Sequence, residues 1–176
     1  VMQVLETCPR TLLCVNLLDE AEKRQIAIDL PQLEQLLGIP VVGMAARSGT
    51  GLPEFQQRLF DLLHQPAPQP QPCPVPEQLE QPLEQIQNEL PENLCGLQRE
   101  WTARRLLEPE PELHEKIAAH GNISLEIPAL SDALEQTWKQ YSPEVCADAM
   151  IAAIVRHSEA LAAQTVHQPE QTDAAD

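Results

Sequence analysis

The chain has 176 residues, with 27 Asp and Glu against 11 Lys and Arg, which gives a formal net charge of −16 at pH 7. This charge opposes binding to nucleic acid and to anionic lipid surfaces, because both attract Lys and Arg that displace counterions. The five cysteines are an odd number without a C-x-x-C pair, which argues against a disulfide framework and favours the cytosol.

The first predicted strand covers residues 11–15 and is followed by two polar residues, Asn16 and Asp19. An aliphatic run of this length suits a buried strand of a parallel sheet, and ligands bind where such strands end. A carboxylate at Asp19 can accept both N1–H and N2–H of guanine, whereas adenine would leave it unsatisfied. Asn16 would hold the loop and reach guanine N7. By itself the N-x-x-D pattern is also typical of a turn or a helix cap, so both interpretations stay open.

The next elements predict a small α/β unit. Residues 20–25 and 30–37 are predicted to be helical, with an extended connector at 26–29, Pro31 in the first turn of the second helix and Gly38 after its end. A second strand is expected at 39–44, and 52–64 shows the apolar spacing of a helix with one buried face. Right-handed crossovers would make the two strands parallel neighbours in one sheet.

The remainder predicts a linker and then only helices. Many of the 17 prolines fall between 66 and 91, so residues 65–76 are expected to be an extended linker. Helices are predicted at 77–90, 92–107, 110–120, 127–141 and 143–166, without any strand. The predicted domains are therefore 1–64, an α/β partial parallel sheet, and 77–165, an all-α helical bundle, with a disordered tail at 166–176.

The order of these motifs resembles that of a P-loop GTPase. A strand precedes N-x-x-D, a helical crossover leads to a second strand, and a small-residue loop similar to S-A-K/R follows at 45–52. More narrowly, residues 15–23, 26–30, 37–42 and 45–52 resemble the ferrous iron transport protein B family. The segment REWTARRLLE at 99–108 is similar to a helix of the helical domain in the same family.

This resemblance implies a guanine-base site and a larger parent protein. The implied base-binding residues are Asn16, Leu17, Asp19, Ala45, Ala46 and Arg47, with GTP or GDP as the ligand. The Ala46 backbone N–H would contact guanine O6. The family resemblance further implies a helical domain that modulates GDP release, on the cytoplasmic side of an inner-membrane transporter that couples GTP to Fe(II) uptake.

Several departures from the family pattern limit this interpretation. Neither G-x-x-x-x-G-K-S/T nor D-x-x-G occurs, so hydrolysis is not assigned, and a missing half of the G domain would supply the phosphate contacts and Mg²⁺. The chain begins at Val1 without Met, which suggests a fragment. Leu17 replaces a frequent Lys, and Ala45 replaces the usual Ser. The alternative hypothesis is a GTPase-derived helical adaptor without nucleotide chemistry.

Other candidate sites favour structural roles. The five histidines show neither i, i+4 pairs nor Glu-x-x-His spacing, so no metal site is predicted. Trp101 and Trp138 are expected to fill the helical core rather than form a binding site. Arg104 and Arg105 are expected to pair with Glu100 and Glu108 on their own helix. No apolar run approaches the about 20 residues of a membrane-spanning helix.

Overall fold

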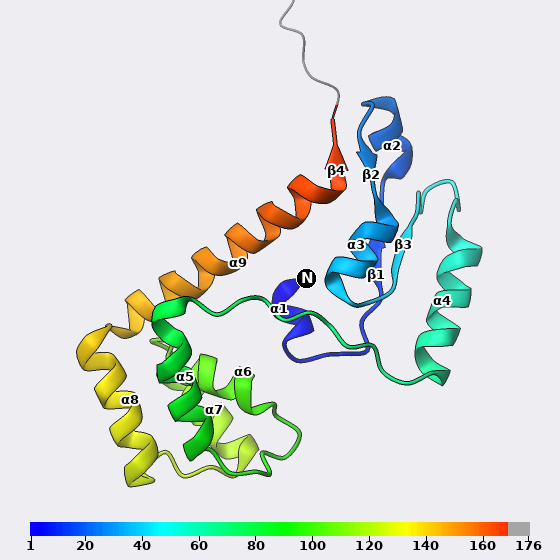
Figure 1. The fold of residues 1–176 in the computed structure, drawn as a ribbon. Coiled ribbons are helices and arrows are strands. Elements are labelled where there is room, and N and C mark those ends of the chain that lie inside the picture. Colours follow the sequence, from blue (N-terminus) through cyan, green and yellow to red (C-terminus); the bar gives the residue numbers. More distant parts are fainter. Residues whose placement is uncertain (169–176) are drawn as a thin grey trace, which may run out of the picture. The chain divides into compact units, whose positions relative to one another are not determined.

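The computed structural model describes residues 1–168 and divides the chain into two units (Figure 1). One unit contains Val1–Pro72 together with the chain from His157 onward, and the other is Cys73–Arg156. The division differs from the boundaries expected from sequence, because the final turns of the last helix belong with the first unit. The first unit is therefore discontinuous in sequence.

The first unit is an α/β unit. Its elements are α1 (Met2–Leu5), β1 (Leu13–Val15), α2 (Leu18–Lys23), β2 (Ala27–Ile28), α3 (Leu30–Leu37), β3 (Val41–Gly43), α4 (Leu52–His64), the end of α9 (Pro143–Thr165) and β4 (Val166–His167). The strands β1 and β3 are parallel neighbours, as the sequence predicted, with Leu13 opposite Val41 and Val15 opposite Gly43. They are shorter than expected. β3 is well buried and β1 is half-buried, and each is the other's single strand neighbour among residues 1–168.

The outer edge of β3 is covered by a side chain. The parallel register directs the Val41 N–H away from β1, and it donates to Glu34 Oε2 at 3.0 Å. Arg58 holds the other carboxylate oxygen of Glu34 at 3.1 Å. Pairing with a further strand at Val41 is thereby blocked, which is a common protection of sheet edges.

Helix α3 begins and ends where the sequence predicts. The Asp29 carboxylate accepts a hydrogen bond from the Gln32 N–H at 2.9 Å and caps the first turn of the helix. Pro31 is tolerated in this turn because the N–H that proline lacks would have no partner within the helix. Gly38 ends the helix in the left-handed region at φ 67°. A Cβ on Gly38 would lie 2.3 Å from the Gln69 carbonyl oxygen, so this position also requires the absence of a side chain.

A second, two-stranded sheet joins the two ends of the first unit. Strand β2 pairs antiparallel with β4, with Ala27 opposite His167 and Ile28 opposite Val166. The sequence predicted a connector at 26–29 and a disordered tail from 166, and the strand at Val166–His167 shows that prediction to be wrong at its first residues. The rest of that tail, 169–176, lies outside the described residues.

The second unit is a helical bundle, as predicted. It contains α5 (Glu77–Glu89), α6 (Arg99–Leu106), α7 (Pro111–Gly121), α8 (Pro128–Gln140) and the first part of α9. Its core is mainly aliphatic, and Trp101 and Trp138 pack against it, as expected from sequence. The most deeply buried large aliphatic side chains of this core are Leu79, Leu83, Ile86, Leu106, Leu107 and Leu130. The predicted helix at 92–107 is too long, because Cys95 and Gly96 have positive φ and α6 begins only at Arg99.

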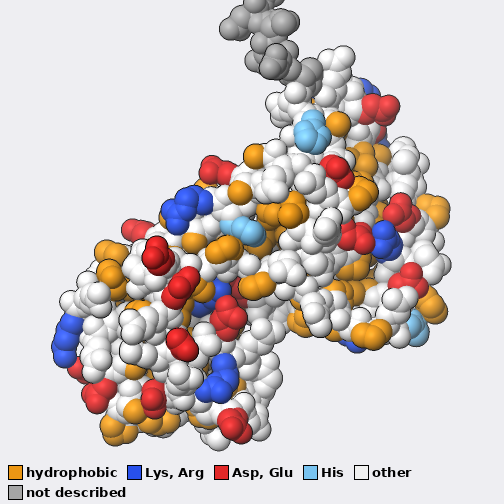
Figure 2. Space-filling view, viewed as in Figure 1, with side chains coloured by type: hydrophobic (Ala, Val, Ile, Leu, Met, Phe, Trp, Pro, Cys, Tyr) orange, Lys and Arg blue, Asp and Glu red, His pale blue; other side chains and the backbone are white. Residues whose placement is uncertain are grey.

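The surface of the chain reflects its composition. Acidic side chains are spread over the face seen in Figure 2, with apolar side chains among them. The predicted pairs form, with Arg104 bonded to Glu100 at 2.6 Å and Arg105 to Glu108 at 2.7 Å. None of the helices within residues 1–168 is long and apolar enough to cross a membrane.

Candidate functional site

Two loops meet at the carboxyl ends of the parallel strands β1 and β3. Because parallel strands end at the same edge of a sheet, the residues after Val15 and after Gly43 lie together. The Met44 N–H donates to the Val15 carbonyl at 2.9 Å, and the Leu18 N–H donates to the Met44 carbonyl at 3.2 Å. The backbone thus joins the N-x-x-D loop to the small-residue loop.

The Asn16 carboxamide strengthens this junction. Its Oδ1 accepts a hydrogen bond from the Ala46 N–H at 3.1 Å, across 30 residues of sequence. Both residues are exposed, so the Nδ2 group of Asn16 remains accessible to a ligand. The Ala46 N–H is the donor predicted to contact guanine O6, but it already donates to Asn16, so the two acceptors would share it. The next backbone donor in the loop is the N–H of Arg47.

Asp19 carries an unsatisfied acceptor beside this junction. It lies in the first turn of α2 and is half-buried. Its Oδ1 is buried yet has no hydrogen-bond partner in the described part of the chain. A buried carboxylate oxygen without a donor is costly, so Asp19 has an unmet hydrogen-bonding requirement at this position. The neighbouring Lys23 is engaged by Glu20 at 2.8 Å, which lowers the pKa of Glu20.

Leu17 is held in an unusual backbone conformation between these two polar residues. Its φ of 64° is in the left-handed region, which costs a non-glycine residue roughly 1–2 kcal/mol. Its side chain is 58% exposed. An exposed leucine next to Asn16 and Asp19 offers an apolar surface on which a flat ring can rest.

The small-residue loop is braced by its own hydrogen bonds. Ala45 is buried, and its N–H donates to the Thr50 carbonyl at 3.0 Å. The Ser48 hydroxyl donates to the Ala45 carbonyl at 3.1 Å and lies 2.9 Å from the Thr50 hydroxyl. Ser48 and Thr50 were not predicted as site residues. They supply hydroxyl groups near the position where Ala45 lacks one.

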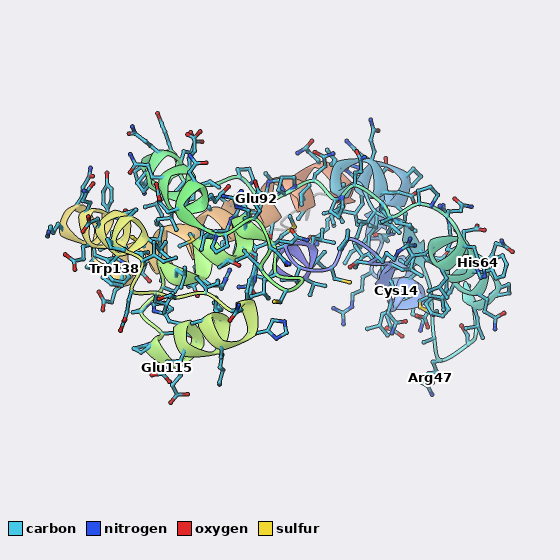
Figure 3. The ribbon with its side chains drawn as sticks, turned by 90° about the horizontal axis from the view of Figure 1, so that it is seen from below. Cys14, Arg47, His64, Glu92, Glu115 and Trp138 are labelled. Atoms are coloured by element: carbon cyan, nitrogen blue, oxygen red, sulfur yellow. The ribbon has the colours of Figure 1, made fainter. Side chains whose placement is uncertain are left out.

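Arg47 lies in the exposed part of this loop. Figure 3 shows its side chain directed outward from the loop that follows β3. The six residues predicted as base contacts therefore fall on two adjacent loops. Asn16, Asp19, Leu17 and Ala46 gather at the junction, Ala45 lies beneath it, and the side chain of Arg47 extends from it.

Two glycines allow the loops to approach the sheet. A Cβ on Gly43 would lie 2.4 Å from Leu18 Cδ1 and 2.5 Å from Leu30 Cδ1. A Cβ on Gly51, which has φ 81°, would lie 2.3 Å from the Gly43 carbonyl oxygen.

Among residues 1–168, no group of three or more His, Cys, Asp or Glu side chains is placed to hold a metal ion.

The fold and the site define a partial GTPase-type α/β domain that is followed by an all-α domain. Residues 1–59 match the family model described as Ferrous iron transport protein B, and residues 76–167 match the model described as FeoB cytosolic helical domain. The chain belongs to the ferrous iron transport protein B family.

Curated relatives match about a third of the chain. A segment of 62 residues is 40% identical to the Fe(2+) transport protein A/Fe(2+) transporter FeoB fusion protein of Porphyromonas gingivalis, covering 35% of this chain and 7% of that protein. A segment of 57 residues is 39% identical to the Fe(2+) transporter FeoB of Legionella pneumophila, strain Paris, covering 32% of this chain and 8% of that protein. The matches thus span only a small part of these relatives.

Solved structures share the fold of most of the chain. The cytosolic domain of L. pneumophila FeoB has a TM-score of 0.67 at 24% identity and covers 95% of this chain and 61% of that one. The mGMPPNP-bound NFeoB from S. thermophilus has a TM-score of 0.66 at 18% identity, with coverages of 98% and 62%. The cytosolic domain of the T. maritima FeoB iron transporter in GDP form I has a TM-score of 0.65 at 20% identity, with coverages of 94% and 59%.

Proposed function

We propose that the loops at 16–19 and 45–47 recognise the guanine base of a nucleotide bound by a GTP-dependent ferrous iron transporter. The observation that carries this proposal is the buried Asp19 Oδ1, which has no donor within the described residues and follows by three residues the Asn that joins the two loops. A ligand with two adjacent N–H donors would satisfy this carboxylate. Guanine has such a pair at N1 and N2.

The other groups at the junction fit the remaining faces of the base. Asn16 keeps its Oδ1 on the Ala46 N–H and offers Nδ2 to guanine N7. Guanine O6 accepts from the backbone N–H groups of Ala46 and Arg47. Leu17 covers one face of the ring, with its exposed side chain in place of a lysine stem. Adenine is rejected because its N1 lone pair would face the carboxylate of Asp19.

The phosphate chemistry belongs to residues that this sequence does not contain. No glycine-rich phosphate loop occurs, so the rest of the G domain would hold the phosphates and Mg²⁺. In the intact transporter, GTP binding and hydrolysis would be coupled to Fe(II) uptake, and the helical unit would modulate GDP release. The GDP and mGMPPNP named for the related structures support a guanine nucleotide as the ligand.

The substitution Asp19→Asn tests the base site in the full-length transporter. Asparagine has one acceptor and one donor, so it suits xanthine, which carries a carbonyl at C2. We expect the affinity for GDP to fall about a hundredfold and the affinity for XDP to rise. Competition against a fluorescent nucleotide measures both.

The matched control is Asp148→Asn, which removes the same charge from an exposed position on α9. It should leave both affinities unchanged. If Asp19→Asn also leaves GDP affinity unchanged, Asp19 does not contact the base and the helical adaptor becomes the better interpretation.

The 176-residue chain alone gives a second test. It keeps the base contacts without the phosphate contacts that supply most nucleotide affinity, so calorimetry with GDP should show a dissociation constant of roughly 1 mM or weaker. Micromolar binding would contradict the proposal that the phosphates are held elsewhere.

A further inference from the structure

The last residues matched by the helical-domain family complete the α/β unit. That match extends to 167, yet β4 at Val166–His167 pairs with β2 of the first unit. The Asp29 N–H donates to the Thr165 carbonyl at 2.7 Å and continues the same register. Thr165 is buried, and its hydroxyl donates to the Leu161 carbonyl at 2.8 Å. The end of α9 is thereby fastened to residues 27–29.

The strand to which α9 is fastened is connected to the proposed base site on its amino-terminal side. The Ile26 N–H donates to the Ala21 carbonyl at 2.8 Å, which attaches the start of β2 to α2. Asp19 lies in the first turn of that same six-residue helix. The Ile26–Ala21 hydrogen bond therefore connects the start of β2 directly to α2, the helix that carries the proposed base contact Asp19.

A second connection lies on the carboxyl-terminal side of β2. Asp29 caps α3, and Leu30 follows it directly. The Cδ1 atoms of Leu30 and Leu18 both occupy the space where Gly43 would carry a Cβ, at 2.5 and 2.4 Å from that position. Leu18 belongs to the N-x-x-D loop. Strand β2 is thus connected to the N-x-x-D loop on both sides, through α2 on one side and through Leu30 on the other.

We propose that β4 is a positioning element of the base site, and that its pairing with β2 sets how firmly α2 holds Asp19 against the base. The pairing with β4 fixes the position of β2. Strand β2 in turn fixes α2, which carries Asp19, and Leu30, which packs beside Leu18. The inference rests on the proposed base site and names its regulation. All of these contacts lie in the first unit, and α9 connects that unit covalently to the helical one.

The size of this ladder suits a regulatory contact. Two residues pair on each strand, so the ladder contains few hydrogen bonds and can open without unfolding the α/β unit. Any movement of α9 that opens the ladder would loosen α2 and weaken the hold of Asp19 on the base. By linkage, a bound guanine would in turn favour the paired state of β4.

The substitution His167→Pro in the full chain tests this inference. In an antiparallel ladder, hydrogen-bonded and non-hydrogen-bonded pairs alternate. Because Asp29 and Thr165 are hydrogen-bonded, the pair of Ala27 and His167 is hydrogen-bonded as well, and the His167 N–H points to Ala27. Proline at 167 removes this N–H. His167 is far in sequence from α2 and pairs with β2, so we expect an effect on α2 to pass through the ladder. We expect amide exchange at Asp29, Ile26 and Leu18 to become about five- to tenfold faster.

The matched control is Gln168→Pro, one residue further and outside the ladder. It should leave these amides unchanged. Unchanged exchange at Ile26 and Leu18 in His167→Pro would overturn the inference, whether or not Asp29 exchanges faster.

A second measurement separates this inference from the base site itself. In the full-length transporter, His167→Pro should increase the GDP dissociation rate about five- to tenfold, and Gln168→Pro should not. If Asp19→Asn changes the base preference but His167→Pro alters neither exchange nor GDP release, the positioning role fails and the base site stands. If His167→Pro accelerates exchange but Asp19→Asn leaves the base preference unchanged, the base site fails and only the link from β4 to α2 stands.

Discussion

Gly43 is the position at which the two base loops rest on the sheet. An added Cβ would lie 2.4 Å from Leu18 Cδ1 and 2.5 Å from Leu30 Cδ1, so both side chains would have to move. We expect Gly43→Ala to reduce the free energy of unfolding of the chain by about 1–3 kcal/mol, the usual effect of overpacking, measured by urea denaturation. The control is Gly49→Ala in the neighbouring loop. Gly49 has φ 79° and no atom near its missing Cβ, so only backbone strain of about 1 kcal/mol applies. An equal effect of both substitutions would contradict the packing role of Gly43.

The cysteines should differ in reactivity. Burial raises the pKa of the Cys146 thiol, and the nearby Glu144 carboxylate raises it further. Because the thiolate is the reactive form, a raised pKa leaves less of it at any pH below that pKa. We expect a thiol reagent at pH 8 to label the exposed Cys8 and Cys95 rapidly, and the buried Cys73 and Cys146 only when the chain is unfolded. Mass spectrometry of timed samples measures this, and rapid labelling of Cys146 in the folded chain would contradict it.

The residues of the proposed base site differ in how far sequence alone reveals them. Asn16 and Asp19 follow a strand at a fixed spacing, and the chemistry of guanine makes that spacing meaningful. The bracing by Ser48 and Thr50 is not visible in the sequence, because it depends on the conformation of the loop. The bond between Asn16 and the Ala46 N–H joins residues 30 positions apart, and only the pairing of β1 with β3 brings them together.

At the scale of the element, the edge of β3 offers a test of sheet protection. Glu34→Ala removes the acceptor of the Val41 N–H and the main partner of Arg58. We expect a loss of about 1–3 kcal/mol in the free energy of unfolding and increased self-association through the opened edge. Urea denaturation and analytical ultracentrifugation measure these effects. Glu54→Ala is the control, because Glu54 also lies 3.9 Å from Arg58 but does not bond the strand. Equal self-association of the two variants would show that the edge is not protected by Glu34.

The helices were predicted wherever a local signal marks their ends. Gly38 after α3 and the prolines in the first turns of α7 and α8 act on adjacent residues, so the sequence reveals them. The region before α6 was assigned to the helix because its composition permits one. Instead, Cys95 and Gly96 have positive φ and form an exposed turn before α6. Strand β4 has two residues, and their partners lie 138 and 140 positions away (166 − 28 and 167 − 27), which no local pattern indicates.

At the scale of the whole molecule, the two units should differ in independence. The second unit is continuous in sequence and contains the aliphatic core of α5 to α8, so Cys73–Arg156 expressed alone should fold with a single sharp thermal transition. Val1–Pro72 alone lacks β4 and leaves β1 with an open edge, so it should aggregate or lack fixed packing. Circular dichroism and amide exchange compare the two segments. Protected amides in β1 together with rapid exchange around Trp101 would be the opposite result.

The discontinuity of the first unit affects the order in which the chain takes shape during synthesis. Residues 1–72 are synthesised before 157–167, so β2 gains its partner only after the helical unit has been made. The helical unit is made entirely within that interval, and its contacts are local enough to form at once. The helical unit is translated after residues 1–72 but is expected to reach its final structure before them. The base loops would acquire their support only when the end of α9 emerges.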